Sequence, residues 1–331
     1  MKYNRYAIIG SNSFAGAAFV LRALDTGAKV IGFNRSPEGS NIFLPYKKSP
    51  NKGNYLFYQA DINHDLEKIV SVLNDFQPEV IVDFSGQGMV AESWDNPSQW
   101  YTTNIVAKVR LHDFLRKCEW LKRFIRISTP EVYGSHDNKI TESWDFNPTT
   151  PYAVSHAAID MSLKAFWQNY DFPVVFTRYA NFYGSGQQLY RIVPRTIIYA
   201  LTGRKLYLHG GGSSIRAFIH STDVSDGILK SILNGMPGEI YHFSPNQFYT
   251  IKEVVETICL AVGVEFSDLV EMAPDRAGKD KAYLMDSDKA RLELGWNDNT
   301  TLERGINETV TWVKENLSEI NNLPLDYIHK A

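Results

Sequence analysis

Cysteine is scarce in this chain, and long hydrophobic runs are missing from it. The 331 residues include 2 cysteines, Cys118 and Cys259, which lie too far apart for the dense disulfide framework of a small secreted domain. No stretch approaches the roughly 20 consecutive apolar residues of a membrane-spanning helix, and residues 1–10 lack the apolar run and cleavage site of a signal peptide. We therefore expect two reduced cysteines and a soluble, cytoplasmic protein without a membrane partner.

An excess of charge of one sign is also missing. The chain has 34 Lys and Arg residues against 37 Asp and Glu residues, and its formal net charge is −3. Proteins that coat nucleic acid usually carry a concentrated basic excess, so no nucleic-acid partner is expected. The 8 histidines show no His-x-x-x-His spacing, and the Gly-Lys-Ser/Thr sequence of a P-loop does not occur. These absences argue against a metal site and against P-loop phosphate chemistry.

The sequence does contain a regular alternation of short β-branched runs and helical patterns. Strands are expected at residues 6–10, 29–33, 55–60, 80–82, 123–127 and 174–176, and helices at residues 14–26, 65–76, 97–118 and 151–170. Alternation of this kind is typical of a parallel sheet with helices on both faces. The predicted fold class is therefore α/β, with a Rossmann-like doubly wound parallel sheet.

The pattern changes after residue 180, where polar and glycine-rich stretches appear. The last predicted helices, 251–262 and 302–317, have no predicted strands between them. We therefore expect a smaller, mainly helical substrate lobe at the carboxyl edge of the sheet, where open parallel sheets bind ligands. The expected division is a dinucleotide-binding domain at residues 1–180, with a return segment near 217–245, and a substrate lobe at 181–216 and 246–331. Residues 36–54, rich in Pro, Gly, Ser and Asn, are expected to be flexible.

A glycine-containing loop joins the first predicted strand to the first predicted helix. A dinucleotide pyrophosphate needs a tight turn, a bare backbone and the positive N-terminus of a helix. Gly10 and Gly16 supply two of the three bare positions, and Ser13 stands where the middle glycine is usual. The Ser13 hydroxyl is still able to approach a phosphate, and Phe14 opens the helix. The loop therefore predicts a dinucleotide-binding site.

Two further strand ends are candidates for the adenosine half of the cofactor. An acidic residue at the end of the second strand usually binds the ribose hydroxyls, but Asn34 and Arg35 occupy this point. Asparagine does not repel a 2′-phosphate and arginine can pair with one, so NAD is the expected cofactor and NADP stays an open alternative. Asp61 and Ile62 follow the third strand, where an acidic side chain can meet the adenine amino group.

Several segments carry a more specific signal. They are Ser-Thr-Pro-Glu-Val-Tyr-Gly at 128–134, Pro-Tyr-Ala-Val-Ser-His at 151–156, Thr-Arg-Tyr-Ala-Asn-Phe-Tyr-Gly at 177–184, and the stretches at 214–224, 275–283 and 292–296. In their residue types and in their order along the chain, these segments resemble the motifs of the extended short-chain dehydrogenases. Within them the chain is most similar to the nucleoside-diphosphate-sugar 4,6-dehydratases, in particular the dTDP-glucose enzymes. The resemblance covers nearly the whole chain.

This resemblance implies that NAD takes hydride from the sugar C4, that water leaves across C5 and C6, and that hydride returns to C6. It assigns removal of the C4 hydroxyl proton to Tyr152. A phenol with a pKa of about 10 needs a positive environment to act as a base at neutral pH. The family provides a lysine four residues later on the same helical face, which also holds the nicotinamide ribose, but this chain has His156 there. With a reference pKa of about 6.5, His156 is expected to be charged only part of the time.

The same resemblance assigns the elimination to the segment after the fifth strand. Glu131 matches the base that removes the C5 proton, and Thr129 matches a hydroxyl that hydrogen-bonds the sugar O4. The dTDP-glucose enzymes have an acidic aspartate between these two, where this chain has Pro130, which cannot donate a proton. In a same-face elimination, Glu131 takes the C5 proton and passes one to the C6 oxygen. The catalytic residues are therefore expected to be Thr129, Glu131, Tyr152 and His156.

The remaining site residues are assigned by resemblance. Further cofactor contacts are expected from Ser85, Gly86, Asn104, Tyr152, His156 and Tyr179. Substrate contacts are expected from Gly88, Met89, Asn181, Arg191, His209, Arg216 and Arg276. The arginines suit a diphosphate, because a guanidinium offers a fork of donors. The family usually has Ser-His at Gly88 and Met89, so the identity of the sugar stays open.

The family also pairs two helices from each subunit into a four-helix dimer interface. Around residues 105–118 and 153–166 this chain is apolar on more than one face, so a homodimer is expected. Two alternatives to a dehydratase remain open. One is an epimerase or a decarboxylase on the same scaffold. The other is a non-catalytic, cofactor-bound sensor, which is suggested by His156 and Pro130.

Overall fold

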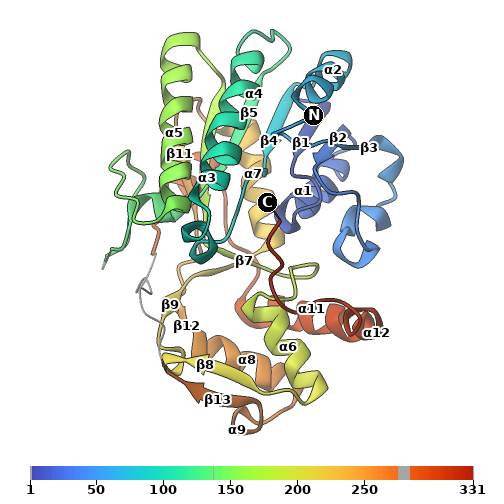
Figure 1. Ribbon diagram of the computed structural model, residues 1–331, viewed down its shortest axis with the longest axis vertical. Coiled ribbons are helices and arrows are strands. Elements are labelled where there is room, and N and C mark those ends of the chain that lie inside the picture. The colour runs from blue at the N-terminus through green and yellow to red at the C-terminus, as the bar shows by residue number, and fades with distance from the viewer. Residues whose placement is uncertain (1, 137, 275–283, 331) are drawn as a thin grey trace.

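A parallel sheet forms the centre of the protein. The computed structural model describes residues 2–136, 138–274 and 284–330 (Figure 1). Seven strands pair in parallel in the order β11-β6-β5-β4-β1-β2-β3. Their bounds are β1 Arg5–Ile9, β2 Lys29–Asn34, β3 Tyr55–Gln59, β4 Val80–Asp83, β5 Arg123–Ser128, β6 Val174–Tyr179 and β11 Ile240–Phe243. The predicted α/β class is confirmed, and the strand order reverses between β1 and β4, where a ligand crevice is expected.

Helices cover both faces of this sheet, because side chains on both sides of its strands are apolar. The covering helices are α1 Phe14–Leu24, α2 Leu66–Phe76, α4 Lys108–Leu115, α5 Pro151–Tyr170, α7 Ser221–Asn234 and α10 Asp288–Leu294. Tyr6 and Ile8 of β1 pack with α1, α7 and α10 in one buried cluster. Ala7 and Ile9 point to the opposite face and pack with α2, α4 and α5 in a second cluster. The sheet is therefore doubly wound, as the sequence predicts.

The helix predicted at 97–118 is divided into three parts. It consists of α3 (Pro97–Tyr101), a π-helical segment (Thr102–Ala107) and α4, which ends at Leu115. Asn104 lies in the π-helical segment, and its side-chain amide pairs with the backbone of Gln87 at 2.8 and 3.1 Å. Short π-helical turns occur often at functional sites, and here the widened turn carries a predicted cofactor residue.

The second lobe lies below the sheet in Figure 1. Its helices are α6 Ile192–Thr202, α8 Ile251–Val262, α9 Phe266–Leu269, α11 Leu302–Glu315 and α12 Leu317–Ile320. Three two-stranded sheets join them: β7 Asn181–Tyr183 with β10 Phe218–His220, β9 Ile215–Arg216 with β12 Tyr249–Thr250, and β8 Leu206–His209 with β13 Val270–Ala273. The expectation of no strands between the last helices was wrong, because β13 lies between α8 and α11, where it pairs with the distant β8.

Residues 36–54, predicted to be flexible, are packed against the sheet. The segment forms three short 3₁₀ turns, Asn41–Phe43, Pro45–Lys48 and Lys52–Asn54. Leu44 and Tyr46 are buried in the α1 side of the core, and the Tyr46 hydroxyl donates to Glu38 at 2.8 Å. The composition suggested a loose loop, but the apolar area of two buried side chains holds the segment in place.

Candidate active site

The glycine loop between β1 and α1 closes tightly. Gly10 has a φ of +82°, and a Cβ there would lie 2.8 Å from the Phe84 carbonyl carbon. A Cβ at Gly16 would lie 2.2 Å from the Gly10 carbonyl oxygen, so neither position accepts a side chain. The Ser13 hydroxyl donates to the Gly10 carbonyl at 2.7 Å and accepts from the Gly16 amide at 3.1 Å. Ser13 therefore caps α1, and the amides of the first turn, beginning with Phe14, are the groups that suit a phosphate.

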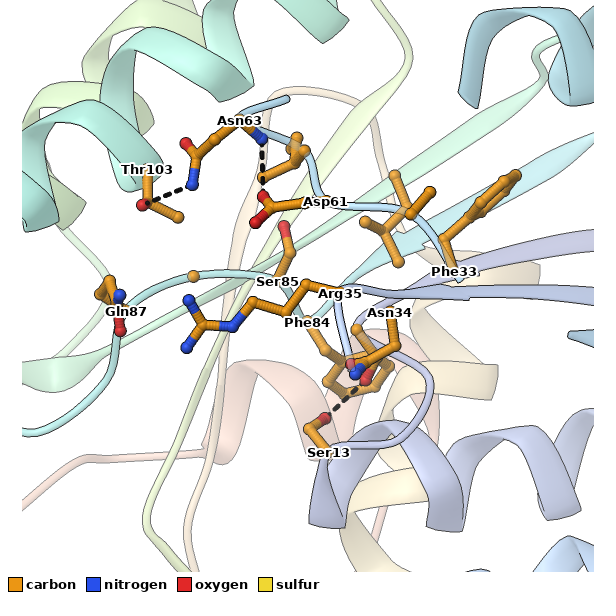
Figure 2. A pocket seen from close by; sticks show the side chains of 15 residues that line it. Ser13, Phe33, Asn34, Arg35, Asp61, Asn63, Phe84, Ser85, Gln87 and Thr103 are labelled. Atoms are coloured by element: carbon orange, nitrogen blue, oxygen red, sulfur yellow. Dashed lines mark hydrogen bonds between the residues drawn. The ribbon is translucent and has the colours of Figure 1, made fainter. Parts of the chain in front are cut away.

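A pocket opens beside this loop at the carboxyl ends of β1 to β4 (Figure 2). Eight predicted cofactor residues line it: Gly10, Ser13, Asn34, Arg35, Asp61, Ile62, Ser85 and Gly86. The Asp61 carboxylate accepts from the Asn63 amide at 2.8 Å, and the Asn63 side chain donates to Thr103 at 3.1 Å. The glycine loop, which has no side chains at Gly10 and Gly16, suits a pyrophosphate. The polar side chains of Asp61, Asn63 and Thr103 suit the adenosine part of a dinucleotide.

The end of β2 has no acidic side chain. Asn34 donates to the Ser36 carbonyl at 3.2 Å, and Arg35 extends across the pocket toward Gln87 in Figure 2. Nη2 of Arg35 donates to the Lys330 carbonyl at 2.9 Å, and the Gln87 side chain donates to the same oxygen at 2.8 Å. The segment near Lys330 thus crosses this side of the cleft. The sequence analysis did not detect this contact, because no motif marks it.

Asn104 connects the pocket beside the glycine loop to the helix that carries Tyr152. Besides pairing with Gln87, its amide donates to the Ser155 hydroxyl at 3.0 Å, which donates to the Tyr152 carbonyl at 2.7 Å. Gly86 has a φ of +145°, and a Cβ there would lie 2.8 Å from Oδ1 of Asn104. The loop after β4 is therefore locked against α5 by one buried amide.

Three predicted catalytic residues meet at the carboxyl end of β5. Thr129 directly follows β5, and Glu131 lies in the 3₁₀ turn Pro130–Tyr133. Tyr152 stands in the first turn of α5, where the Thr150 hydroxyl caps the helix by accepting from the Ala153 amide at 3.2 Å. Burial raises the pKa of the Tyr152 phenol, and the Glu131 carboxylate raises it further. A hydrogen bond with Thr129 lowers this pKa, as do the charges of Arg126 and Arg191, so Thr129 and Glu131 both act on the Tyr152 phenol.

His156 lies beside Tyr152, with the ring centroids 4.5 Å apart. Nη2 of Arg126 approaches Nδ1 of His156 to 3.0 Å. Burial lowers the pKa of His156 well below its usual value, and the charges of Arg126, Lys108 and Arg178 lower it further. The expectation of a partly charged His156 was therefore wrong, since a buried imidazole surrounded by cations stays neutral at physiological pH.

A buried network of charged residues supports this corner of the site. Asp160 binds Nε of Arg126 at 2.9 Å and Nη2 of Arg178 at 3.0 Å. Asp83 binds Lys108 at 2.8 Å, and all five side chains are at most 1% exposed. Although burial opposes it, the charges of Lys108 and Arg126 hold the pKa of Asp83 below its usual value. The sequence analysis missed this network. The available signal was a charged residue inside each of three apolar strands.

Removing the shared anion should destabilise the fold strongly. We expect Asp160→Asn to lower the free energy of unfolding by about 3–5 kcal/mol, because two buried guanidinium groups lose their counter-charge. Urea unfolding followed by circular dichroism measures this. The matched control is Asp113→Asn, which removes an ion pair with Arg116 on the surface and should leave the unfolding midpoint unchanged. Equal midpoints for the two variants would contradict a stabilising role for Asp160.

Four of the seven predicted substrate residues are dispersed over the second lobe. Asn181 is exposed on β7, and Arg191 precedes α6 with its guanidinium over the Tyr190 ring at 5.3 Å. His209 ends β8, where Nδ1 lies 3.0 Å from the Pro274 carbonyl oxygen. Arg216 on β9 donates to the Ile215 carbonyl at 2.7 Å. Arg276 lies outside the described residues. The Arg191 charge lowers the pKa of Tyr152, which connects this lobe electrostatically to the predicted catalytic tyrosine.

Two predicted residues near the sugar and one near the cofactor have distinct surroundings. The Gly88 carbonyl accepts from the Trp100 indole at 3.0 Å, and Met89 has a φ of +67°, which is uncommon for a side chain of this size. The Tyr179 ring stacks on Phe243 with centroids 4.8 Å apart and is buried in the core. The Tyr179 side chain therefore does not join the pocket of Figure 2.

Other kinds of site find no support within residues 2–136, 138–274 and 284–330. Across these ranges no three His, Cys, Asp or Glu side chains are grouped so that they could hold a metal ion. None of the helices there has the length and the apolar composition needed to cross a membrane. Both cysteines are free thiols.

Comparison with known proteins identifies the family. A family model described as GDP-mannose 4,6 dehydratase matches residues 8–309. A dTDP-glucose 4,6-dehydratase from Xanthomonas campestris pv. campestris is 29% identical over 330 residues, which cover 94% of this chain and 93% of the relative. A Homo sapiens dTDP-D-glucose 4,6-dehydratase is 31% identical over 279 residues, which cover 82% of this chain and 79% of the relative.

Solved structures agree with this assignment. The dTDP-glucose 4,6-dehydratase DesIV from Streptomyces venezuelae, solved with NAD bound, is 30% identical with a TM-score of 0.85, covering 95% of this chain and 98% of that chain. A UDP-glucose 4-epimerase from Thermotoga maritima, solved with UDP-glucose, is 25% identical with a TM-score of 0.85, covering 95% and 99%. The chain therefore belongs to the NDP-sugar 4,6-dehydratase family of extended short-chain dehydrogenases.

Proposed function

We propose that this protein is an NAD(P)-dependent nucleotide-sugar 4,6-dehydratase that produces an NDP-4-keto-6-deoxy sugar. The observation that carries this proposal is the meeting of Thr129, Glu131 and Tyr152 at the end of β5. A tyrosine is sufficient for oxidation at C4, whereas elimination across C5 and C6 also needs an adjacent carboxylate. When bound, NAD(P) would supply the hydride chemistry: hydride would be taken from C4 and returned to C6, and C5 would take up a proton that balances the one received by Tyr152.

The proposed division of labour follows the two lobes. Residues 1–180, with the return segment near 217–245, hold the dinucleotide, and residues 181–216 and 246–331 hold the nucleotide sugar. Besides Gly88 and Met89 of the loop after β4, the described residues proposed to contact the substrate are Asn181, Arg191, His209 and Arg216. The carboxyl edge of the sheet faces this lobe, so the sugar is brought to the end of β5 (Figure 1).

Oxidation at C4 is assigned to Tyr152. Its phenolate oxygen accepts the proton of the C4 hydroxyl, while the Thr129 hydroxyl hydrogen-bonds O4. Arg126 and Arg191 lower the pKa of the phenol, which opposes the effects of burial and of Glu131. The C4–O–H group thus becomes a ketone, with its proton on Tyr152.

Elimination is assigned to Glu131. The C4 ketone makes the C5 proton acidic, and the Glu131 carboxylate removes it. The C6–O bond then breaks, and the proton on Glu131 passes to the leaving oxygen to form water. Pro130 is buried and has no proton to donate, so one carboxyl group performs both transfers.

Mass spectrometry tests this function directly. Purified protein is incubated with NAD or NADP and a panel of dTDP-, UDP-, GDP- and CDP-hexoses. Loss of one water from one member establishes dehydration and identifies the nucleotide. Unchanged mass for every member, with no isomer found by NMR, would reject catalysis and support a non-catalytic sensor.

A second candidate is an epimerase on the same scaffold. The 25% identical UDP-glucose 4-epimerase structure, with a TM-score of 0.85, favours it. An epimerase does not need Glu131, and its product has the mass of its substrate. A new isomer of equal mass would therefore replace the dehydratase proposal.

The cofactor is proposed to be NAD, with NADP as the alternative. Relatives of known structure bind NAD, and the glycine loop fits either dinucleotide. Asn34 and Arg35, which line the pocket at the end of β2, carry no negative charge that would repel a 2′-phosphate, and an arginine can pair with one. Calorimetric titration with both cofactors decides between them, and Arg35→Ala should weaken binding of NADP more than binding of NAD.

A homodimer through helices beside the active site is part of the proposal. Val106 of the π-helical segment and Val154 and Met161 of α5 are 55%, 38% and 61% exposed, although all three are apolar. These helices pack side by side (Figure 1), and we propose that the three side chains belong to one apolar surface. An equivalent surface on a second subunit would bury it.

Met161→Asp should convert the dimer into a monomer. A carboxylate buried against an apolar partner surface loses its hydration without a counter-charge. Light scattering after gel filtration measures the mass. Leu260→Asp, at an 84% exposed position of α8 in the other lobe, is the matched control and should leave the mass unchanged. A wild-type monomer would reject the dimer outright.

A further inference from the structure

His156 occupies the position of the family's lysine, and one nitrogen of its ring contacts the side chain of Arg126, which is buried. Nη2 of Arg126 lies 3.0 Å from Nδ1 of His156. A guanidinium has only donors, so Nδ1 must accept this hydrogen bond. A neutral imidazole that accepts at Nδ1 carries its proton at Nε2. If His156 were protonated on both nitrogens, its Nδ1–H would point at the N–H of Arg126, and two positive charges would lie next to each other.

Arg126 is held in this position on all sides. Its Nε donates to Asp160 at 2.9 Å, and its Nη1 donates to the Ile127 carbonyl at 2.7 Å. The other Asp160 oxygen accepts from Ser128 at 2.5 Å and from Arg178 at 3.0 Å. The Asp160 carboxylate therefore orients Arg126, and Ser128 and Arg178 orient this carboxylate.

The charges around His156 agree with this geometry. The titratable and charged groups of this buried cluster are Asp83 of β4, Lys108 of α4, Arg126 of β5, Tyr152 and Asp160 of α5, and Arg178 of β6. Within this cluster three cations face two carboxylates, while the Glu131 carboxylate acts on Tyr152 from outside it and raises the pKa of the phenol, an effect that the Arg126 charge opposes. Burial lowers the pKa of Lys108 to about 8, so this ammonium is still mostly charged at neutral pH.

The function of the missing lysine is thereby divided between two residues. His156 stays neutral, so it offers a hydrogen-bond donor at Nε2 but no charge. Arg126 has the charge, and this charge lowers the pKa of Tyr152. Arg126 is buried and reaches the site through His156, so it is not itself expected to touch the cofactor.

We propose that Arg126 is the positioning residue of this site: anchored by Asp160, it holds His156 as the Nε2–H tautomer and supplies the positive charge next to Tyr152. The kinetic part of this inference rests on the proposed dehydratase function. The tautomer of His156 does not, because it follows from the contact between two side chains.

The same geometry makes a lysine at position 156 incompatible with Arg126. An ammonium cannot accept the hydrogen bond from Nη2, and it would add a second buried cation at this contact. His156→Lys alone should therefore lower activity instead of restoring the family's arrangement. Removing the arginine in the same chain should relieve the conflict, which makes the two substitutions strongly non-additive.

NMR of protein labelled with ¹⁵N in the histidine rings tests the tautomer without any substrate. The His156 signals are assigned as those lost in His156→Gln. We expect a proton on Nε2, none on Nδ1, and no titration between about pH 5 and pH 8. In Arg126→Met, where Asp160 keeps Arg178 and Ser128, both tautomers should appear. A wild-type His156 protonated at Nδ1, or titrating near its reference pKa, would overturn the proposal.

Steady-state kinetics over pH tests the positioning role, with the nucleotide sugar identified by mass spectrometry. Arg126→Met should lower kcat at neutral pH by about 10²-fold and change KM less than about threefold. Loss of the cation raises the pKa of Tyr152, so the acid limb of kcat should move to higher pH. Arg126→Lys keeps a charge and a donor and should recover most of the activity, which a role in packing alone would not explain.

The double variant supplies the decisive comparison. Arg126→Met with His156→Lys should be at least about tenfold more active than His156→Lys alone. A double variant no faster than His156→Lys, or an acid limb unmoved in Arg126→Met, would refute the positioning role. If no nucleotide sugar is turned over by wild-type protein, the dehydratase proposal fails, while the ring NMR still decides whether Arg126 sets the tautomer.

Discussion

A Tyr152→Phe variant is expected to bind cofactor and nucleotide sugar but to form product on the order of 10³-fold more slowly than wild-type protein. The phenol oxygen is the group proposed to accept the C4 hydroxyl proton, and phenylalanine removes that oxygen while keeping the ring. Without this step no hydride leaves C4. The absorbance of reduced nicotinamide should therefore stay at baseline in a single-turnover experiment, and mass spectrometry should show unchanged substrate.

Tyr170→Phe is the matched control, because this tyrosine ends the same helix and is 52% exposed. Its turnover should equal that of wild-type protein. If Tyr152→Phe formed product at the wild-type rate, Tyr152 would not be the base, and the proposed oxidation step would be wrong.

Glu131→Gln is expected to separate oxidation from elimination. The amide cannot remove the C5 proton, so loss of water should slow by about 10²–10⁴-fold. Tyr152 is retained, and the pKa of its phenol should fall because the Glu131 carboxylate raises it. Oxidation at C4 should therefore continue, and reduced nicotinamide should accumulate where wild-type protein shows only a transient.

Glu119→Gln, on the exposed turn before β5, provides the control and should behave as wild-type protein. The result also discriminates between the two candidate enzymes. An epimerase would lose little activity in Glu131→Gln, whereas a dehydratase would release no keto sugar. Dehydration at the wild-type rate in this variant would remove Glu131 from the mechanism.

Local signals in the sequence predicted much of the fold. α5 and α8 have the predicted bounds, because Thr150 and Thr250 cap them and Glu253 completes a capping box at α8. Strands buried on both faces read as continuous apolar runs, so the parallel sheet was also predictable. Elements that depend on distant partners were not. β8 and β13 exist only as a pair, and neither segment alone carries a strong strand signal.

The candidate site divides in the same way. Gly10 and Gly16 were predictable, since a loop between a strand and a helix that must approach a phosphate excludes side chains. The hydroxyl of Ser13 was not, because it satisfies the backbone of its own loop. The network of Asp160, Arg126 and Arg178 was missed, since residues from two strands and one helix meet only in the folded protein.

The sequence by itself determined the α/β class, the glycine loop after β1 and the family, because each depends on residue types at short, regular spacings. Only the tertiary structure decided the state of His156. Its ionisation depends on burial and on the charge of Arg126, which is 30 residues away in the chain and 3.0 Å away in space. A pKa and a tautomer are properties of an environment, and distant segments create that environment only when they pack together.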